Sequence, residues 1–136
     1  MPYSTAALAG KVILVAEDEY MLADAIEAAI RSAGGEVQGP FASAREALAH
    51  LADAGRQPDA AALNINLLDG ESFPVADELS RRGVPYVFAS ARSVGSLPGR
   101  FARVSSVPKP YAAYQVVQAL MALLDAADTP PATTAG

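Results

Sequence analysis

The feature that most constrains the fold is the alternation of short apolar runs with longer segments of helical periodicity. The runs expected to form strands are residues 11–15, 59–64, 85–89 and 102–107, with a weaker one at 36–39. A short run that is apolar throughout is typical of a strand covered by helices on both faces. Because strands that alternate with helices favour right-handed crossovers and a parallel sheet, the pattern predicts an α/β fold.

The segments between these runs carry the signals that begin and end helices. Helices are predicted over residues 20–33, 72–82 and 111–126, and from Ser43 to near Gly55. Ser43 and Glu46 have the spacing of a capping box, and Pro74 is tolerated because it falls in a first turn. Between residues 90 and 109 the breakers Gly95, Pro98 and Gly99 interrupt any helical pattern. We therefore expect a fourth helix that is short, distorted or absent.

Length and composition point to one domain without a membrane segment. A chain of 136 residues suits a single core, which we expect over residues 11–126, with an N-terminal extension over 1–10 and a flexible C-terminal tail over 127–136. The formal net charge of −5 disfavours nucleic acid and anionic membranes as partners. The absence of cysteine, of a signal peptide and of a long apolar run favours a cytoplasmic protein.

Polar side chains stand where four of the predicted strands end. Glu17 and Asp18 follow the first strand, Asn64 closes the third, Ser90 follows the fourth and Lys109 the fifth. In an open parallel sheet the binding crevice lies beyond the carboxyl ends of the strands. We therefore expect these side chains to meet in one pocket although they are far apart in the sequence.

This ordered set resembles the receiver domain of two-component response regulators, over roughly Lys11 to Asp125. The resemblance implies a flavodoxin-like, doubly wound (βα)5 fold with a five-stranded parallel sheet of order 2-1-3-4-5. It also implies that position 64 is the phosphoacceptor and that Ser90 and Lys109 support the phosphoryl group. The implied magnesium ligands are the side chains of Glu17, Asp18 and residue 64 and the backbone carbonyl of Asn66.

Asn64 stands where the receiver family has its phosphorylated aspartate. A carboxamide is uncharged and a poor nucleophile, so a stable acyl phosphate at this position is excluded. The change also removes one anionic oxygen ligand, and Mg²⁺ gains most from such ligands. We expect any magnesium to be held weakly, and we expect no enzymatic activity.

Signalling is expected to pass through association. Ser106 lies three positions before Lys109, where receivers commonly have an aromatic residue that swings inward on activation. The expected partners are a histidine kinase or a phosphotransfer protein, bound without phosphorylation of residue 64. The face made by the last strand and helix is the candidate contact surface, and a homodimer could form there.

Two alternatives stay open at this point. The chain could be an ordinary phosphoacceptor receiver, a phosphorelay switch or a phosphate sink, in which an engineered change replaced Asp by Asn64. It could also be a phosphohydrolase of the haloacid-dehalogenase-like class, with Asp18 as nucleophile and Lys109 as charge clamp. That class needs a further acidic pair beyond the lysine, and none lies near a predicted strand end.

Overall fold

The computed structural model describes residues 3–53, 55–90, 92 and 96–128. The strands of the main sheet are β1 (Val12–Ala16), β2 (Glu36–Phe41), β3 (Ala60–Leu63), β6 (Tyr86–Ser90) and β7 (Ser106–Pro108). The helices are α1 (Tyr20–Ser32), α2 (Ala44–Asp53), α3 (Phe73–Arg81) and α4 (Ala113–Asp128). A small hairpin of β4 (Asn66–Leu67) and β5 (Gly70–Glu71) and a 3-10 helix, η2 (Gly99–Phe101), complete the elements.

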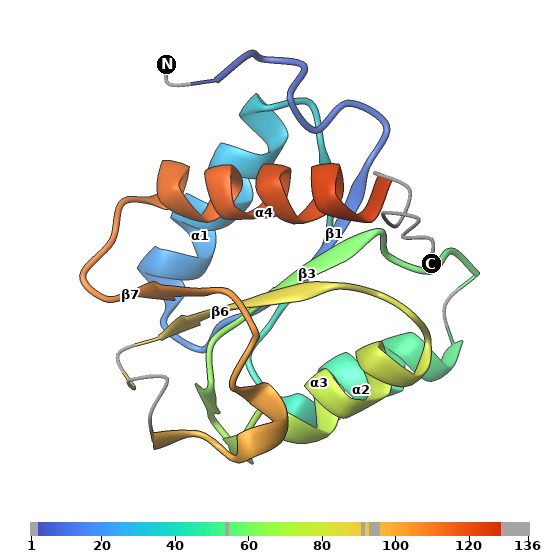
Figure 1. Ribbon diagram of the computed structural model, residues 1–136, viewed down its shortest axis with the longest axis vertical. Coiled ribbons are helices and arrows are strands. Elements are labelled where there is room, and N and C mark those ends of the chain that lie inside the picture. The colour runs from blue at the N-terminus through green and yellow to red at the C-terminus, as the bar shows by residue number, and fades with distance from the viewer. Residues whose placement is uncertain (1–2, 54, 91, 93–95, 129–136) are drawn as a thin grey trace, which may run out of the picture.

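The main sheet has the order β2-β1-β3-β6-β7, and every neighbouring pair is parallel. Counted along the main sheet alone, this is the order 2-1-3-4-5, so the predicted flavodoxin-like topology is confirmed. Helices α1 and α4 cover one face of the sheet, and α2 and α3 cover the other (Figure 1).

Both faces of the central strands are buried, which explains why their sequences are apolar throughout. In β1, Ile13 and Val15 pack in the cluster that includes α1 and α4, whereas Leu14 and Ala16 pack in the cluster that includes α2 and α3. Successive side chains of a strand point to opposite faces, so a strand between two helical layers needs apolar residues at every position.

The amino end of α2 is held by two side chains, of which the sequence predicted one. The Glu46 backbone N–H donates to Ser43 Oγ at 3.1 Å, and Ser43 Oγ donates to Glu46 Oε1 at 3.0 Å. The predicted pairing of these two residues is therefore confirmed. Asp69 adds a cap from outside the helix, because its carboxylate accepts the backbone N–H groups of Ala44 at 2.8 Å and Arg45 at 3.0 Å. These bonds lower the pKa of Asp69.

The predicted last strand over residues 102–107 is wrong at its beginning. Residues 99–101 form η2, and β7 begins only at Ser106. The physical reason is Phe101, which is 1% exposed and stacks on Phe73 with ring centroids 4.8 Å apart. Burial of this ring beside α3 draws the chain away from the sheet edge. In the described part of the connection from β6 to β7 there is no α-helix, in agreement with the predicted loss or distortion of the fourth helix.

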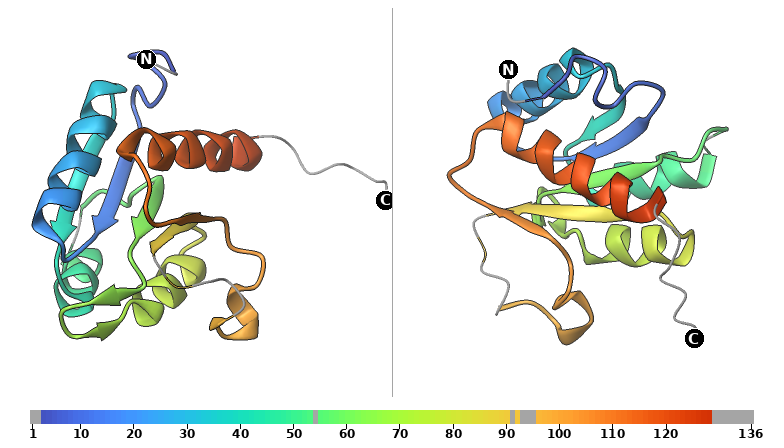
Figure 2. Two further views of the ribbon diagram at one scale, coloured as in Figure 1. Left: turned by 90° about the vertical axis from the view of Figure 1, so that its left-hand side faces the viewer. Right: turned by 45° about the horizontal axis from the view of Figure 1, so that its top comes forward.

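The chain ahead of β1 packs on the domain. Leu8 is fully buried, and its backbone N–H donates to the carbonyl oxygen of Ala33 at 2.8 Å. Figure 2 shows this segment beside the carboxyl end of α1. At the other end α4 continues to Asp128, two residues beyond its predicted end, and residues 129–136 of the expected tail lie outside the described residues. None of the helices in the described ranges has the length and apolar character to cross a bilayer.

Candidate functional site

The ends of β1 and β3 bring three of the predicted side chains into direct contact. Glu17 and Asp18 follow β1, and Asn64 follows β3, its neighbour in the sheet. Asn64 Nδ2 donates hydrogen bonds to Glu17 Oε2 at 3.0 Å and to Asp18 Oδ1 at 3.2 Å. One amide group therefore holds two carboxylates together, as a small cation would.

Glu17 is the buried centre of the cluster, with a side chain that is 1% exposed. Its Oε2 also accepts the backbone N–H of Glu19 at 3.0 Å, whereas its Oε1 is buried without a hydrogen-bond partner among the described residues. Burial raises the pKa of Glu17, although the Glu19 N–H, the Lys109 charge and the Asn64 amide act in the opposite direction. The carboxylate is thus only partly satisfied by its neighbours.

Lys109 and Ser90 complete the same edge of the sheet. Lys109 Nζ lies 3.9 Å from Glu17 Oε1 and 3.9 Å from Glu19 Oε1, which makes two long ion pairs. The Lys109 backbone N–H donates to the carbonyl oxygen of Ser90 at 3.2 Å. Ser90 is 1% exposed, and its Oγ accepts the backbone N–H of Arg92 at 3.4 Å. The structure thus gathers all the predicted side chains at the carboxyl ends of four strands.

Asn66 is placed differently from the other predicted residues. It begins β4, pairs with Glu71 across the hairpin and is exposed. Among the described residues, no hydrogen bond joins Asn66 to Glu17 or Asp18. The role of its backbone carbonyl as a metal ligand stays a prediction.

The donor set suits a magnesium ion poorly as it is arranged. Mg²⁺ requires oxygen ligands in near-octahedral geometry, but Asn64 directs N–H groups at Glu17 and Asp18. To ligate a metal through Oδ1, the amide would have to turn and lose both hydrogen bonds. Within the described ranges, no three histidine, cysteine or acidic side chains are grouped so that they could hold a metal ion.

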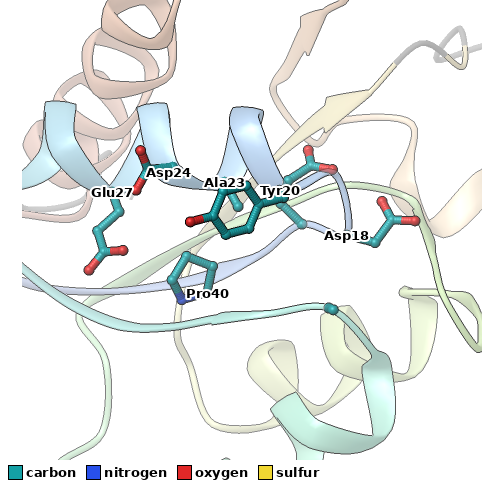
Figure 3. Close-up of a pocket in the computed structure, with 8 residues that line it drawn as sticks. Asp18, Tyr20, Ala23, Asp24, Glu27 and Pro40 are labelled. Carbon is teal, nitrogen blue, oxygen red and sulfur yellow. The ribbon is translucent and has the colours of Figure 1, made fainter.

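A pocket of about 220 Å³ opens beside this cluster, between α1 and Pro40 of β2. Figure 3 shows the Tyr20 ring next to Pro40, with Asp18 on one side of the ring and Asp24 and Glu27 on the other. Tyr20 is 83% exposed. Aromatic side chains such as this one are enriched at surfaces that contact another protein.

Two further large apolar side chains are exposed on the segments that follow the site residues. Met21 follows Tyr20 at the start of α1 and is 80% exposed, and Leu68, between β4 and β5, is 73% exposed. Tyr20, Met21 and Leu68, which we call the mouth residues, lie on the segments that follow the acid pair and Asn64.

Two residues with contacts at or beside the site, Glu19 and Arg92, were not predicted from the sequence. Glu19 was not assigned to the site, yet it contributes an N–H to Glu17 and a carboxylate near Lys109. Arg92 forms an ion pair with Glu71 of the hairpin, and its guanidinium lies 5.7 Å from the centroid of the Phe73 ring. The acidic triplet contained a signal for Glu19, whereas nothing in the sequence pairs Arg92 with Glu71.

Ser106 occupies the place that the sequence assigned to it. It is the first residue of β7, lies opposite Phe88 of β6 and is half-buried. A side chain of this size offers no ring to move between an outward and an inward position. The aromatic residue that is expected to swing inward in ordinary receivers is therefore replaced by a serine at this position.

Solved structures with this fold identify its relatives. No protein-family model matches the sequence, and no curated protein matches it. The chain is 37% identical to SdrG from Sphingomonas melonis Fr1, with a TM-score of 0.70, over 87% of this chain and 98% of SdrG. It is 26% identical to the response regulator PhyR from Brucella abortus, with a TM-score of 0.74, over 87% of this chain and 49% of PhyR.

The chain thus spans about half the length of PhyR and nearly all of SdrG. The HemR receiver domain from Leptospira biflexa is 20% identical over 84% of this chain and 94% of that domain, with a TM-score of 0.69, and supports the fold alone. The sheet order and the identity to SdrG agree with the ordered strand-end residues, and the chain therefore belongs to the response-regulator receiver family.

Proposed function

We propose that this receiver acts in two-component signalling by protein–protein interaction, without carrying a phosphoryl group on residue 64. The observation that carries the proposal is the amide of Asn64, which stands in the phosphoacceptor position and donates to both Glu17 and Asp18. The side chain is engaged in holding the acid pair and offers no anionic oxygen for attack on phosphorus.

Magnesium is proposed to bind weakly. When bound, the metal would offset negative charge on a transferring phosphoryl group, and Glu17 and Asp18 would be the side chains to hold it. A second structure of SdrG is described as its BeF3-activated conformation. Beryllofluoride stands in for a phosphoryl group on a carboxylate, so we propose that the wild-type chain does not respond to it.

The proposed partner is a histidine kinase or a phosphotransfer protein. Tyr20, Met21 and Leu68, the mouth residues, present apolar surface on the segments that follow the site residues. Such a surface buries well against a partner helix. We propose that residues 11–126 form the receiver proper, that the protein works in the cytoplasm, and that a homodimer through β7 and α4 is a second mode of association.

An ordinary phosphoacceptor in which Asn64 replaces a natural aspartate is the second candidate. It is favoured by the retention of every other polar group at this edge, namely Glu17, Asp18, Ser90 and Lys109. The hydrolase alternative has no comparable support, because the carboxylates near Lys109 are those of Glu17 and Glu19, which follow β1 and are not the further acidic pair that this class needs.

Binding to purified histidine kinases and phosphotransfer proteins of the same organism tests the proposal. The wild-type chain should bind one of them with the same affinity whether or not that partner is phosphorylated. Met21→Ala and Leu68→Ala should weaken the complex, while Tyr114→Ala, on the exposed side of α4, serves as the matched control. Movement of a labelled phosphoryl group from the partner to residue 64 would contradict the proposal.

A further inference from the structure

A groove of about 510 Å³ lies at the beginning of β6, at the end of the strand opposite Ser90. Its floor includes Val84 and Tyr86, which are 4% and 9% exposed. The chain after α3, the segment 100–105 and α4 line it. This part of the molecule takes no part in the acid cluster.

At the floor of the groove one residue of the sheet edge, Tyr86, has no strand beside it among the described residues, whereas Pro85 lacks an N–H and the Val84 N–H donates to the Leu79 carbonyl at 2.9 Å. The Ala61 N–H donates to the Pro85 carbonyl, so the Pro85 carbonyl faces β3. Because successive backbone groups of a strand face opposite sides, the N–H and C=O of Tyr86 face away from β3. On that side the Phe88 N–H donates to the Ser105 carbonyl at 2.9 Å, and the register with β7 begins at Phe88. Within the part of the chain that the structure describes, Tyr86 has no strand beside it there.

The short β7 is the cause of this open edge. Figure 1 shows β7 alongside only the later part of β6, with α3 and α4 on either side of the earlier part. Unpaired N–H and C=O groups at a sheet edge are a template for an added strand. The edge is recessed between two helices, which hinders direct pairing with another flat sheet and admits a single extended chain.

Two cations line the same groove. Arg100 is already held by Asp77 through two hydrogen bonds of 3.0 Å and lies over the Phe101 ring. Arg103 is exposed and forms no ion pair with any described residue. A guanidinium without an acidic neighbour is suited to receive a carboxylate in a paired, charge-assisted geometry.

We propose that this edge binds an extended acidic segment of a partner protein, which pairs with the backbone N–H and C=O of Tyr86 and places a carboxylate on Arg103. The unpaired N–H and C=O groups select an extended backbone, and the apolar floor accepts alternate side chains of the bound segment. Arg103 then selects acidic over basic segments. The proposal goes beyond the association proposed at the mouth residues, because the groove lies at the other end of β6.

A displayed library of short linear peptides, panned against the purified full chain, tests the proposal. Selected peptides should be enriched in Asp and Glu, and their binding should shift the backbone amide resonance of Tyr86 with little change at Asn64. Arg103→Glu should weaken the selected peptides by about tenfold or more, the effect of losing one charge-assisted contact. Arg45→Glu is the matched control, because Arg45 is also exposed and without an ion pair among the described residues.

Four outcomes would overturn the proposal. They are a library without binders, binders with no acidic enrichment, binders that shift the amides of the mouth residues instead, and equal losses from Arg103→Glu and Arg45→Glu. Sedimentation of the chain alone provides a further check. Dimers that form with rising concentration and shift the amide resonance of Tyr86 would show that a second copy occupies this edge, which would also contradict the proposal. The melting temperatures of both variants should match the wild type.

Discussion

The two ends of β6 differ in what they keep of the receiver pattern. At its carboxyl end, beside Ser90, the polar residues expected of a receiver lie together, and we propose that position 64 departs from the pattern by having an amide instead of a carboxylate. At its amino end the architecture itself differs, because no α-helix stands in the described part of the connection to β7 and the sheet edge at Tyr86 is open. Under the proposed function, one side chain removes the chemistry at the carboxyl end, whereas at the amino end the path of the backbone itself has changed.

The largest expected effect is at the carboxyl end. Asn64→Asp should convert a chain that accepts no phosphoryl group into one that accepts it from a small phosphodonor, because Lys109 and Glu17 are already placed around position 64. Intact-mass spectrometry before and after incubation measures the change. A variant that accepts no phosphoryl group would show that the site has lost more than its nucleophile. The two ends of β6 would then both depart from the receiver pattern by more than one side chain.

The next effect concerns the amino end and the core beneath it. Phe101→Ala should cost about 3–5 kcal/mol of unfolding free energy, because the ring is buried against Phe73 and Phe88. Denaturant titration measures this loss. Tyr114→Ala, which truncates a ring that is 43% exposed, should change stability by no more than about 0.5 kcal/mol. Equal losses for both variants would mean that η2 is not anchored as described.

A smaller effect is expected in metal affinity. Asn64→Asp should tighten Mg²⁺ binding by about tenfold, or ~1.4 kcal/mol, because a carboxylate oxygen replaces an amide that now donates to the acid pair. Isothermal titration of the wild type and the variant compares the two constants. A wild-type chain that binds magnesium as tightly as the variant would refute the assignment of the Asn64 amide as a substitute for the cation.

The smallest effect is a pH dependence at the end of α3. Hydrogen bonds from Arg81 and Arg82 lower the pKa of Glu78 from 4.5 to about 2. A depressed folded-state pKa contributes stability that is present above pH 4.5 and is lost as the pH falls toward 2. The stability difference between the wild type and Glu78→Gln should therefore shrink over this range. A difference that stays constant with pH would assign the loss to packing.

The sequence allowed the positions of the strand-end residues to be predicted better than the beginning of the last strand. Asn64 and Ser90 could be placed because each ends an apolar run, and the ends of parallel strands share one edge. The cap that Asp69 gives to α2 could not be predicted, because it joins residues distant in sequence and no periodicity records such a contact.

The last strand was predicted too early for a similar reason. The run that ends at Val107 suits a strand, but Phe101 gains more by packing on Phe73 than the preceding backbone gains by pairing at the sheet edge. Such a choice between a core contact and a strand pairing depends on the tertiary fold. Local pattern does not contain it.

We propose that Asn64 leaves the carboxyl end of the sheet organised but chemically silent. The most direct measurement is phosphopeptide mapping of the wild-type chain after incubation with magnesium and an excess of a small phosphodonor, with Asn64→Asp treated in parallel. We predict no phosphoryl group on residue 64 of the wild type and an acid-stable, base-labile adduct on the variant. A phosphoryl group recovered from residue 64 of the wild-type chain would contradict the account.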